Sequence, residues 1–139
     1  MNWFYWSLLS AVFAASTAIL AKSGVQGIDS NLALAIRTSV ILFFTWAIVF
    51  ARGSAAGISA LSQRNWLFLV LSGIATGLSW LCYFRALQLG DASRVAPIDK
   101  LSVVLVILFA ALFLKEPLTA GKGFGGLLIV AGVLLVARD

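Results

Sequence analysis

Four charged residues stand inside long apolar stretches of the sequence, and their types define the chemistry available to the chain. Arg37, Arg85, Asp99 and Lys100 interrupt runs of residues that otherwise carry almost no charge. Three cations near one carboxylate can bind an anionic group such as a carboxylate or a phosphate. A carboxylate next to a cation can also take up and release a proton, because burial and a neighbouring charge shift its proton affinity in opposite directions.

The composition indicates that these charges are embedded in a membrane. Of the 139 residues, 62% are hydrophobic and 11% are charged, and the mean hydropathy is +1.06, so too few polar residues remain to build a water-soluble surface. About 20 apolar residues in a helix cross a bilayer, and lipid offers no partner to an unpaired backbone group. The sequence therefore predicts an all-α, multi-pass integral membrane protein with five transmembrane helices. The spans lie near residues 3–21, 32–51, 66–89, 95–114 and 124–137.

Antiparallel threading of these spans brings the four charges to one side of the membrane. Arg37 lies about one and a half turns into the second span, and Asp99 and Lys100 lie about one turn into the fourth. Arg85 lies near the end of the third span. Because short connections make successive helices antiparallel, we expect the four side chains to converge at a similar depth, as a substrate vestibule with net positive charge. The alternative is that both arginines extend to the interface and that Asp99 pairs with Lys100 or Arg85.

Aromatic residues accompany these charges. Trp80 and Tyr83 precede Arg85 in the third span, and Trp46 lies deep in the second. They can line an apolar pocket and stack on a flat or cationic substrate, or they can simply pack between helices. Both interpretations stay open.

Three further residues, Pro97, Glu116 and Gly125, are expected to have structural roles. Pro97 falls in the first turn of the fourth span, where proline is tolerated, or else marks a bend that faces a cavity. Glu116 follows Lys115 at the end of that span, where it is expected to close the helix and to pair locally. Gly121 and Gly125 are four residues apart, a spacing that lets two membrane helices approach closely.

The connection at residues 53–65 is the longest, and its Ser-Ala-Gly run is typical of a loop or of an interfacial segment.

Other functional classes find little support. The chain has no His, its single Cys82 lies inside the third span, and no motif places a nucleophile beside a base. We therefore expect no catalytic residue, no metal site, no cofactor and no enzymatic activity. The net charge of +5 does not indicate nucleic-acid binding, because the cations lie along the ends of the spans, where they suit membrane lipid.

The charge distribution does not fix the orientation in the membrane. Five spans place the two ends of the chain on opposite sides. Of the ten Lys and Arg residues, four lie on the side of the N-terminus and six on the other, and the six become three when Arg37, Arg85 and Lys100 are set aside as embedded. So small a bias allows either one dominant orientation or insertion both ways.

Three segments in the second half of the sequence form a recognisable pattern: ALQLGDASRVAP at 86–97, KEPL at 115–118 and GGLLIVAG at 125–132. With these segments, the chain resembles the EamA family of the drug/metabolite transporter superfamily. The resemblance covers essentially the whole chain, at the length of one five-helix repeat. Two features depart from the family pattern: Lys115 stands where a glycine usually precedes the glutamate, and the Asp99–Lys100 pair is not shared by all members.

The resemblance implies a fold and a function. Larger members carry two repeats of inverted topology, ten helices in all, and export metabolites or amino acids. A single-repeat member is expected to form a homodimer with one subunit inverted, in a bacterial inner membrane, and to transport small molecules. Proton coupling through Asp99 is a hypothesis within this scheme. Small relatives in the superfamily act on polyprenyl-linked lipids, so a lipid-carrier flippase subunit or an accessory membrane protein is the alternative.

Overall fold

The computed structural model describes residues 2–138, which form helices and the turns between them, with no strand in that range. Five helical segments in it are long and apolar enough to cross a membrane. The predicted all-α fold with five transmembrane helices is therefore confirmed. The chain forms two compact units, each described by itself: a terminal unit of residues 1–22 and 89–139, and a central unit of residues 23–88.

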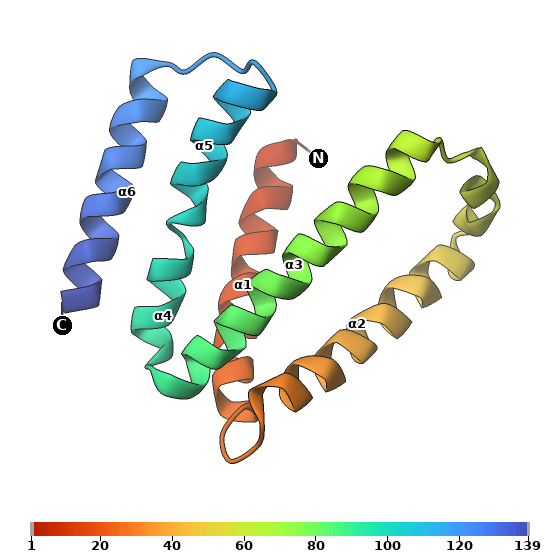
Figure 1. Cartoon of the computed structure of the whole chain (residues 1–139), viewed down its shortest axis with the longest axis horizontal. Coiled ribbons are helices and arrows are strands. Elements are labelled where there is room, and N and C mark those ends of the chain that lie inside the picture. The colour runs from red at the N-terminus through yellow and green to blue at the C-terminus, as the bar shows by residue number, and fades with distance from the viewer. Residues whose placement is uncertain (1, 139) are drawn as a thin grey trace. The chain divides into compact units, whose positions relative to one another are not determined.

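The terminal unit is built around the packing of α4 and α5 against α6. Its helices are α1 (Trp3–Gly24, as far as residue 22), α4 (Ala92–Asp99), α5 (Ser102–Phe113) and α6 (Ala120–Arg138). Figure 1 shows α4 and α5 following one another alongside α6 and running in the opposite direction. Gly126 of α6 is buried, and a Cβ atom built on it would lie 3.8 Å from Val104 Cγ1. An added Cβ would therefore make an ordinary van der Waals contact there, and Gly126 marks a point where α6 lies against α5.

Two long cationic side chains join segments of this unit that are far apart in sequence. Lys22, near the end of α1, donates a hydrogen bond from Nζ to the carbonyl oxygen of Gly90 at 2.8 Å. Arg94 of α4 donates from Nη2 to the carbonyl oxygen of Ala137 at 3.1 Å. The last carbonyls of a helix have no partner within it, and a cation there satisfies them and also suits the helix dipole. Arg94 thus fixes α4 to the end of α6.

The central unit consists of two long helices and a short 3₁₀ helix. These are α2 (Ser30–Ala51), η1 (Ser54–Ala60) and α3 (Gln63–Leu89, as far as residue 88). Asp29 caps α2, because its carboxylate accepts hydrogen bonds from the N–H groups of Asn31 at 2.9 Å and Leu32 at 3.0 Å. Gly53 has φ +67°, a left-handed conformation that glycine adopts without steric cost, and η1 begins directly after it.

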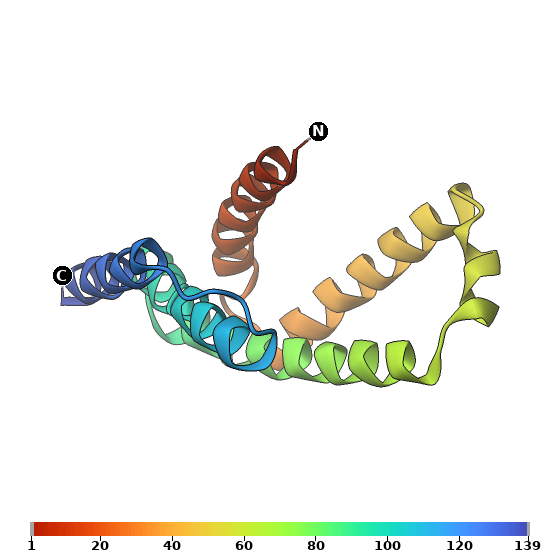
Figure 2. The ribbon, with the colours of Figure 1, turned by 90° about the horizontal axis from the view of Figure 1, so that it is seen from above.

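The core of the central unit lies where α2 begins and α3 ends. Val25, Leu34, Phe84 and Leu87 have exposed fractions of 1%, 7%, 3% and 0%. The two helices are close together there and diverge towards η1 (Figures 1 and 2). The packing that orders this unit is therefore concentrated at one end, which is also the end that carries Arg37 and Arg85.

Most of the remaining surface is apolar, as lipid contact requires. Large side chains such as Phe43 and Leu112 are 75% and 72% exposed. Five hydroxyl groups in the helices donate to the carbonyl four residues earlier, so these five carry no unmatched donor into the hydrocarbon. This pattern holds for Ser7, Ser16, Ser39, Thr45 and Thr76.

Candidate functional site

The fourth membrane-length segment, predicted as one span, is interrupted next to its charged pair. α4 ends at Asp99 and α5 begins at Ser102. Between them the N–H of Lys100 donates to Pro97 O and the N–H of Leu101 donates to Ile98 O, both at 3.0 Å. These bonds reach back three residues instead of four, so the chain tightens into a 3₁₀ turn. Such a turn within a helix is a frequent mark of a functional hinge or of local strain. Pro97, which cannot donate a backbone hydrogen bond, lies inside α4, two residues before its end.

Asp99 and Lys100 form an ion pair at this interruption. Lys100 Nζ lies 3.2 Å from Asp99 Oδ2, and the two side chains are 56% and 35% exposed. Asp99 is seven residues into the segment that starts at Ala92, which corresponds to about 10 Å along a helix. The pair partly neutralises both charges, and its exposure leaves the carboxylate accessible to a ligand.

Arg37 contacts two aromatic rings of the central unit. Its Cζ lies 4.3 Å from the centroid of the Trp80 ring and 5.6 Å from the centroid of the Phe84 ring. Trp80 and Phe84 are four residues apart on α3, so they share one face of that helix. A guanidinium over an aromatic face gains about 0.5–2 kcal/mol, with the larger values where water is excluded. Arg37 is half-buried in this position.

Arg85 is held by a polar chain at the same end of the unit. Its Nη1 donates to Gln88 Oε1 at 2.5 Å, and Gln88 Nε2 donates to the carbonyl oxygen of Ile28 at 2.8 Å. This chain links the last turn of α3 to the segment that precedes α2. Arg85 is exposed and Tyr83 is half-buried.

The six residues predicted for substrate binding or coupling divide between the two units. The central unit holds Arg37, Trp80, Tyr83 and Arg85, and the terminal unit holds Asp99 and Lys100. The structure brings Arg37 together with Trp80, and Asp99 together with Lys100. The convergence of all four charges at one depth stays a prediction.

The end of α5 contains an unusual backbone conformation and a second ion pair. Lys115 has φ +56°, in the left-handed region, and the N–H of Glu116 donates to Ala110 O at 3.1 Å. The Glu116 carboxylate lies 3.4 Å from Lys122 Nζ. Glu116 therefore contributes both its backbone and its side chain to the connection between α5 and α6.

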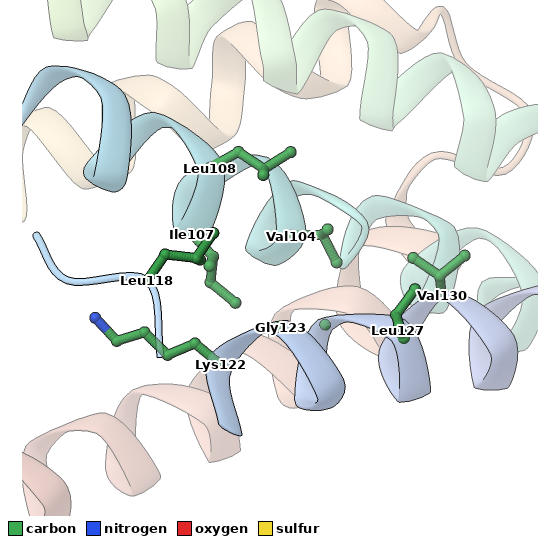
Figure 3. Close-up of a pocket in the computed structure, with 9 residues that line it drawn as sticks. Val104, Ile107, Leu108, Leu118, Lys122, Gly123, Leu127 and Val130 are labelled. Atoms are coloured by element: carbon green, nitrogen blue, oxygen red, sulfur yellow. The ribbon is translucent and has the colours of Figure 1, made fainter. Parts of the chain in front are cut away.

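An apolar groove of about 180 Å³ lies between α5 and α6 (Figure 3). Its lining is apolar apart from Lys122 and includes Gly126. Gly125, which the sequence predicted at a close approach of two helices, is not at one, because a Cβ added there would meet no atom within 4 Å. Hydrocarbon suits such a groove better than a polar substrate does, so it is not the candidate site.

Sequence reasoning missed two residues that position the arginines. Phe84 lies one turn after Trp80, and Gln88 lies three residues after Arg85. The helical spacing of three or four residues was the available signal in both cases.

The sequence matches the model of the EamA-like transporter family over residues 1–138. The chain belongs to this family. The predicted family is thereby confirmed, and the EamA assignment together with five apolar helices identifies an integral membrane protein.

Three relatives illustrate the range of this EamA group. An uncharacterized transporter encoded in the cobO 3′ region of Sinorhizobium sp is 56% identical over 136 residues, covering 98% of this chain and 96% of the relative. The pseudopaline exporter CntI of Pseudomonas aeruginosa is 30% identical over 138 residues, covering 94% of this chain and 47% of the exporter. ArnE of the same species, named as a probable 4-amino-4-deoxy-L-arabinose-phosphoundecaprenol flippase subunit, is 37% identical over 94 residues, covering 68% and 76% of the two chains.

The chain thus spans nearly all of the Sinorhizobium relative and about half the length of CntI. No solved structure matches the chain significantly. The relatives are named as transporters or as a flippase subunit, and none of these three is named as an enzyme.

Proposed function

We propose that the protein is a secondary transporter that exports small metabolites or drug-like molecules across a bacterial inner membrane, without covalent chemistry. The observation that carries the proposal is the Asp99–Lys100 ion pair at the interruption between α4 and α5. Substrate and ion sites of secondary transporters typically lie where membrane helices are discontinuous. Family membership and the exporter CntI support the same function.

Asp99 is the proposed coupling residue. Protonation of its carboxylate breaks the attraction to Lys100, so the charge at the interruption depends on proton uptake. A proton entering from the acidic side then favours one state of the site, and its release on the other side favours the opposite state. The interruption beside Asp99 is the place where the backbone can follow that change.

A transport assay with gradient control tests this function. Proteoliposomes are loaded with a bacterial small-molecule extract, the outside is acidified, and released compounds are identified by mass spectrometry. We expect the wild-type protein to release at least one compound faster than empty liposomes do, and Asp99→Asn to lose the dependence on the gradient. Asp91→Asn is the matched control, because Asp91 is an exposed carboxylate at the start of the same segment and Asn is an equally good helix cap. Release of no compound by any protein would refute the exporter, and equal behaviour of the two variants would remove Asp99 from coupling.

We propose further that two copies act as a homodimer, with one subunit inverted. Two copies would together have about the length of CntI, of which one copy covers 47%. Impermeant thiol labelling of a Cys82→Ser protein with a single cysteine at Asn2 or Asp139 tests the arrangement in intact and opened cells. Labelling of each terminus from both sides supports an antiparallel homodimer. Labelling from one side only excludes it and points to a parallel dimer or to an oppositely inserted partner.

A flippase subunit for a lipid carrier is the second candidate, favoured by the 37% identity to ArnE. In this case Arg37, Arg85 and Lys100 would meet the phosphate of a polyprenyl-linked sugar. The same proteoliposomes distinguish the two functions when a fluorescent lipid-linked sugar replaces the soluble extract. Movement of this lipid without release of any soluble compound favours the flippase.

A further inference from the structure

The guanidinium of Arg37 is oriented by aromatic contacts, which leave its hydrogen-bonding edges unused. Trp80 and Phe84, here called the aromatic clamp, contact it at 4.3 and 5.6 Å from their ring centroids. A guanidinium is planar, and its N–H groups point outward in the plane while its faces stack on rings. Within residues 23–88 Arg37 donates to no oxygen atom, and Tyr83 is the group that interacts with it electrostatically. The clamp therefore fixes the group without satisfying its donors.

The position of Arg37 makes unsatisfied donors costly. Arg37 is seven residues after Ser30, the first residue of α2, or about 10 Å along the helix. A charged group within a membrane-spanning helix characteristically faces a cavity or pairs with a partner, because lipid solvates it poorly. The partner that suits a planar fork of N–H donors is a carboxylate or a phosphate, which it can bind through two parallel hydrogen bonds.

The charge balance of the central unit favours an anion. Residues 23–88 contain four arginines and one carboxylate, Asp29, which gives a net charge of +3. That carboxylate already accepts two backbone hydrogen bonds at the start of α2. Arg85, held by Gln88 at 2.5 Å, adds a second fixed cation at the same end of the unit.

We propose that Arg37, oriented by the aromatic clamp, recognises an oxyanion, namely the carboxylate or phosphate group of the molecule that the protein moves. Naming the ligand as cargo rests on the proposed function, whereas the existence of the anion site does not. The oxyanion belongs either to a soluble metabolite or to a lipid head group. Arg37 contacts the ligand in this arrangement, and Trp80 and Phe84 are positioning residues.

Tryptophan fluorescence tests the site directly, because the Trp80 ring is in contact with Arg37. Trp80 is kept as the single tryptophan, and the full chain is placed in phosphatidylcholine nanodiscs. The other four tryptophans, each replaced by phenylalanine, are Trp3, Trp6, Trp46 and Trp66. Inorganic phosphate and succinate are titrated at constant ionic strength with chloride as the reference anion, and tetraethylammonium is titrated as a cation. A second set of nanodiscs contains phosphatidylglycerol.

We expect phosphate or succinate to change the Trp80 emission and Arg37→Gln to weaken this binding about tenfold or more, as the loss of a charge-assisted contact implies. Arg37→Lys keeps the charge but loses the planar fork, so an intermediate affinity is expected. It also keeps the test valid if Arg37→Gln does not fold. Arg64→Gln is the matched control, because Arg64 also lies near a ring, 5.8 Å from the Phe68 centroid, but in the first turn of α3. Its binding curve should match that of the wild type.

Each of the remaining outcomes either supports or overturns the oxyanion site. A response to phosphatidylglycerol alone, lost in Arg37→Gln, supports the oxyanion site and assigns it to a lipid head group. No response to any anion, or equal affinity in Arg37→Gln and the wild type, overturns the proposal. Tighter binding of tetraethylammonium by Arg37→Gln also overturns it, because the clamp would then be a cation site that Arg37 merely fills.

The binding readout also separates this proposal from the proposed function. Anion binding without transport in proteoliposomes would leave the site in place and remove the transporter. Transport that is insensitive to Arg37→Gln would leave the transporter and remove the site.

Discussion

Replacing Lys115 with glycine should stabilise the protein. Lys115 is the one non-glycine residue in the described part of the chain with a positive φ, +56°. A left-handed conformation costs an L-residue about 1–2 kcal/mol that glycine does not lose. Glycine also gives the unfolded chain more conformational freedom, which reduces this stabilisation by about 0.4–1 kcal/mol. The free energy of unfolding should therefore rise by about 0.5–1 kcal/mol. Unfolding by SDS in dodecyl maltoside micelles, followed by circular dichroism, measures this difference.

Lys115→Ala is the control that separates backbone strain from charge. Alanine removes the ammonium group but keeps the Cβ atom, so it should give no comparable gain. The turn also carries the hydrogen bond from the Glu116 N–H to Ala110 O at 3.1 Å, which glycine preserves. Equal stability of the glycine and alanine variants would show that the left-handed backbone is not a source of strain.

Three other perturbations test the packing. A double-mutant cycle of Arg37→Gln and Trp80→Leu should give a coupling free energy of about 1 kcal/mol in the same unfolding assay, and additive effects would contradict the stacking. Asp29→Ala should cost about 1 kcal/mol because it removes the cap of α2, whereas an unchanged midpoint would mean that the cap contributes nothing. Gly126→Leu should destabilise by about 1–3 kcal/mol through overpacking against α5, and Gly125→Leu, at a position with no atom within 4 Å of an added Cβ, should cost less.

Hydropathy was sufficient to predict the five membrane helices, because lipid demands long apolar runs in helical form. It located the starts of the helices less well. α2, α3, α4 and α6 begin two to four residues before the predicted spans. Their first turns contain residues such as Gln63 and Gly121, which suit the membrane interface and look like loop residues in the sequence.

The interruption of the fourth span could be predicted from the sequence only in part. Pro97 suggested either a helix start or a bend, but the tightened turn lies at Lys100 and Leu101, three residues further on. Pro97 lacks only the hydrogen bond that its own N–H would make one turn earlier, and α4 continues past it to Asp99, so the position of the turn does not follow from the proline alone. It also depends on the packing of α4 and α5 on α6, which is a tertiary property.

The candidate site could likewise be predicted from the sequence only in part. Charge inside apolar runs singled out Arg37, and the position of Trp80 within the third span, before Arg85, singled out that ring. Their contact at 4.3 Å depends on the register of α2 against α3. Helices that are apolar on every face do not encode that register in a periodic pattern, so the partner of Arg37 could not be deduced.

The attachment of both halves of the interrupted span to a single helix limits how that span can move. Arg94 fixes α4 to the last turn of α6 through Ala137, and Val104 of α5 lies against Gly126 in the middle of the same helix. A change of angle at Lys100 and Leu101 therefore cannot swing one half freely, because each half has its own anchor on α6. The two halves must slide along that helix or carry it with them, so a change at the interruption would be transmitted to the middle and to the last turn of α6.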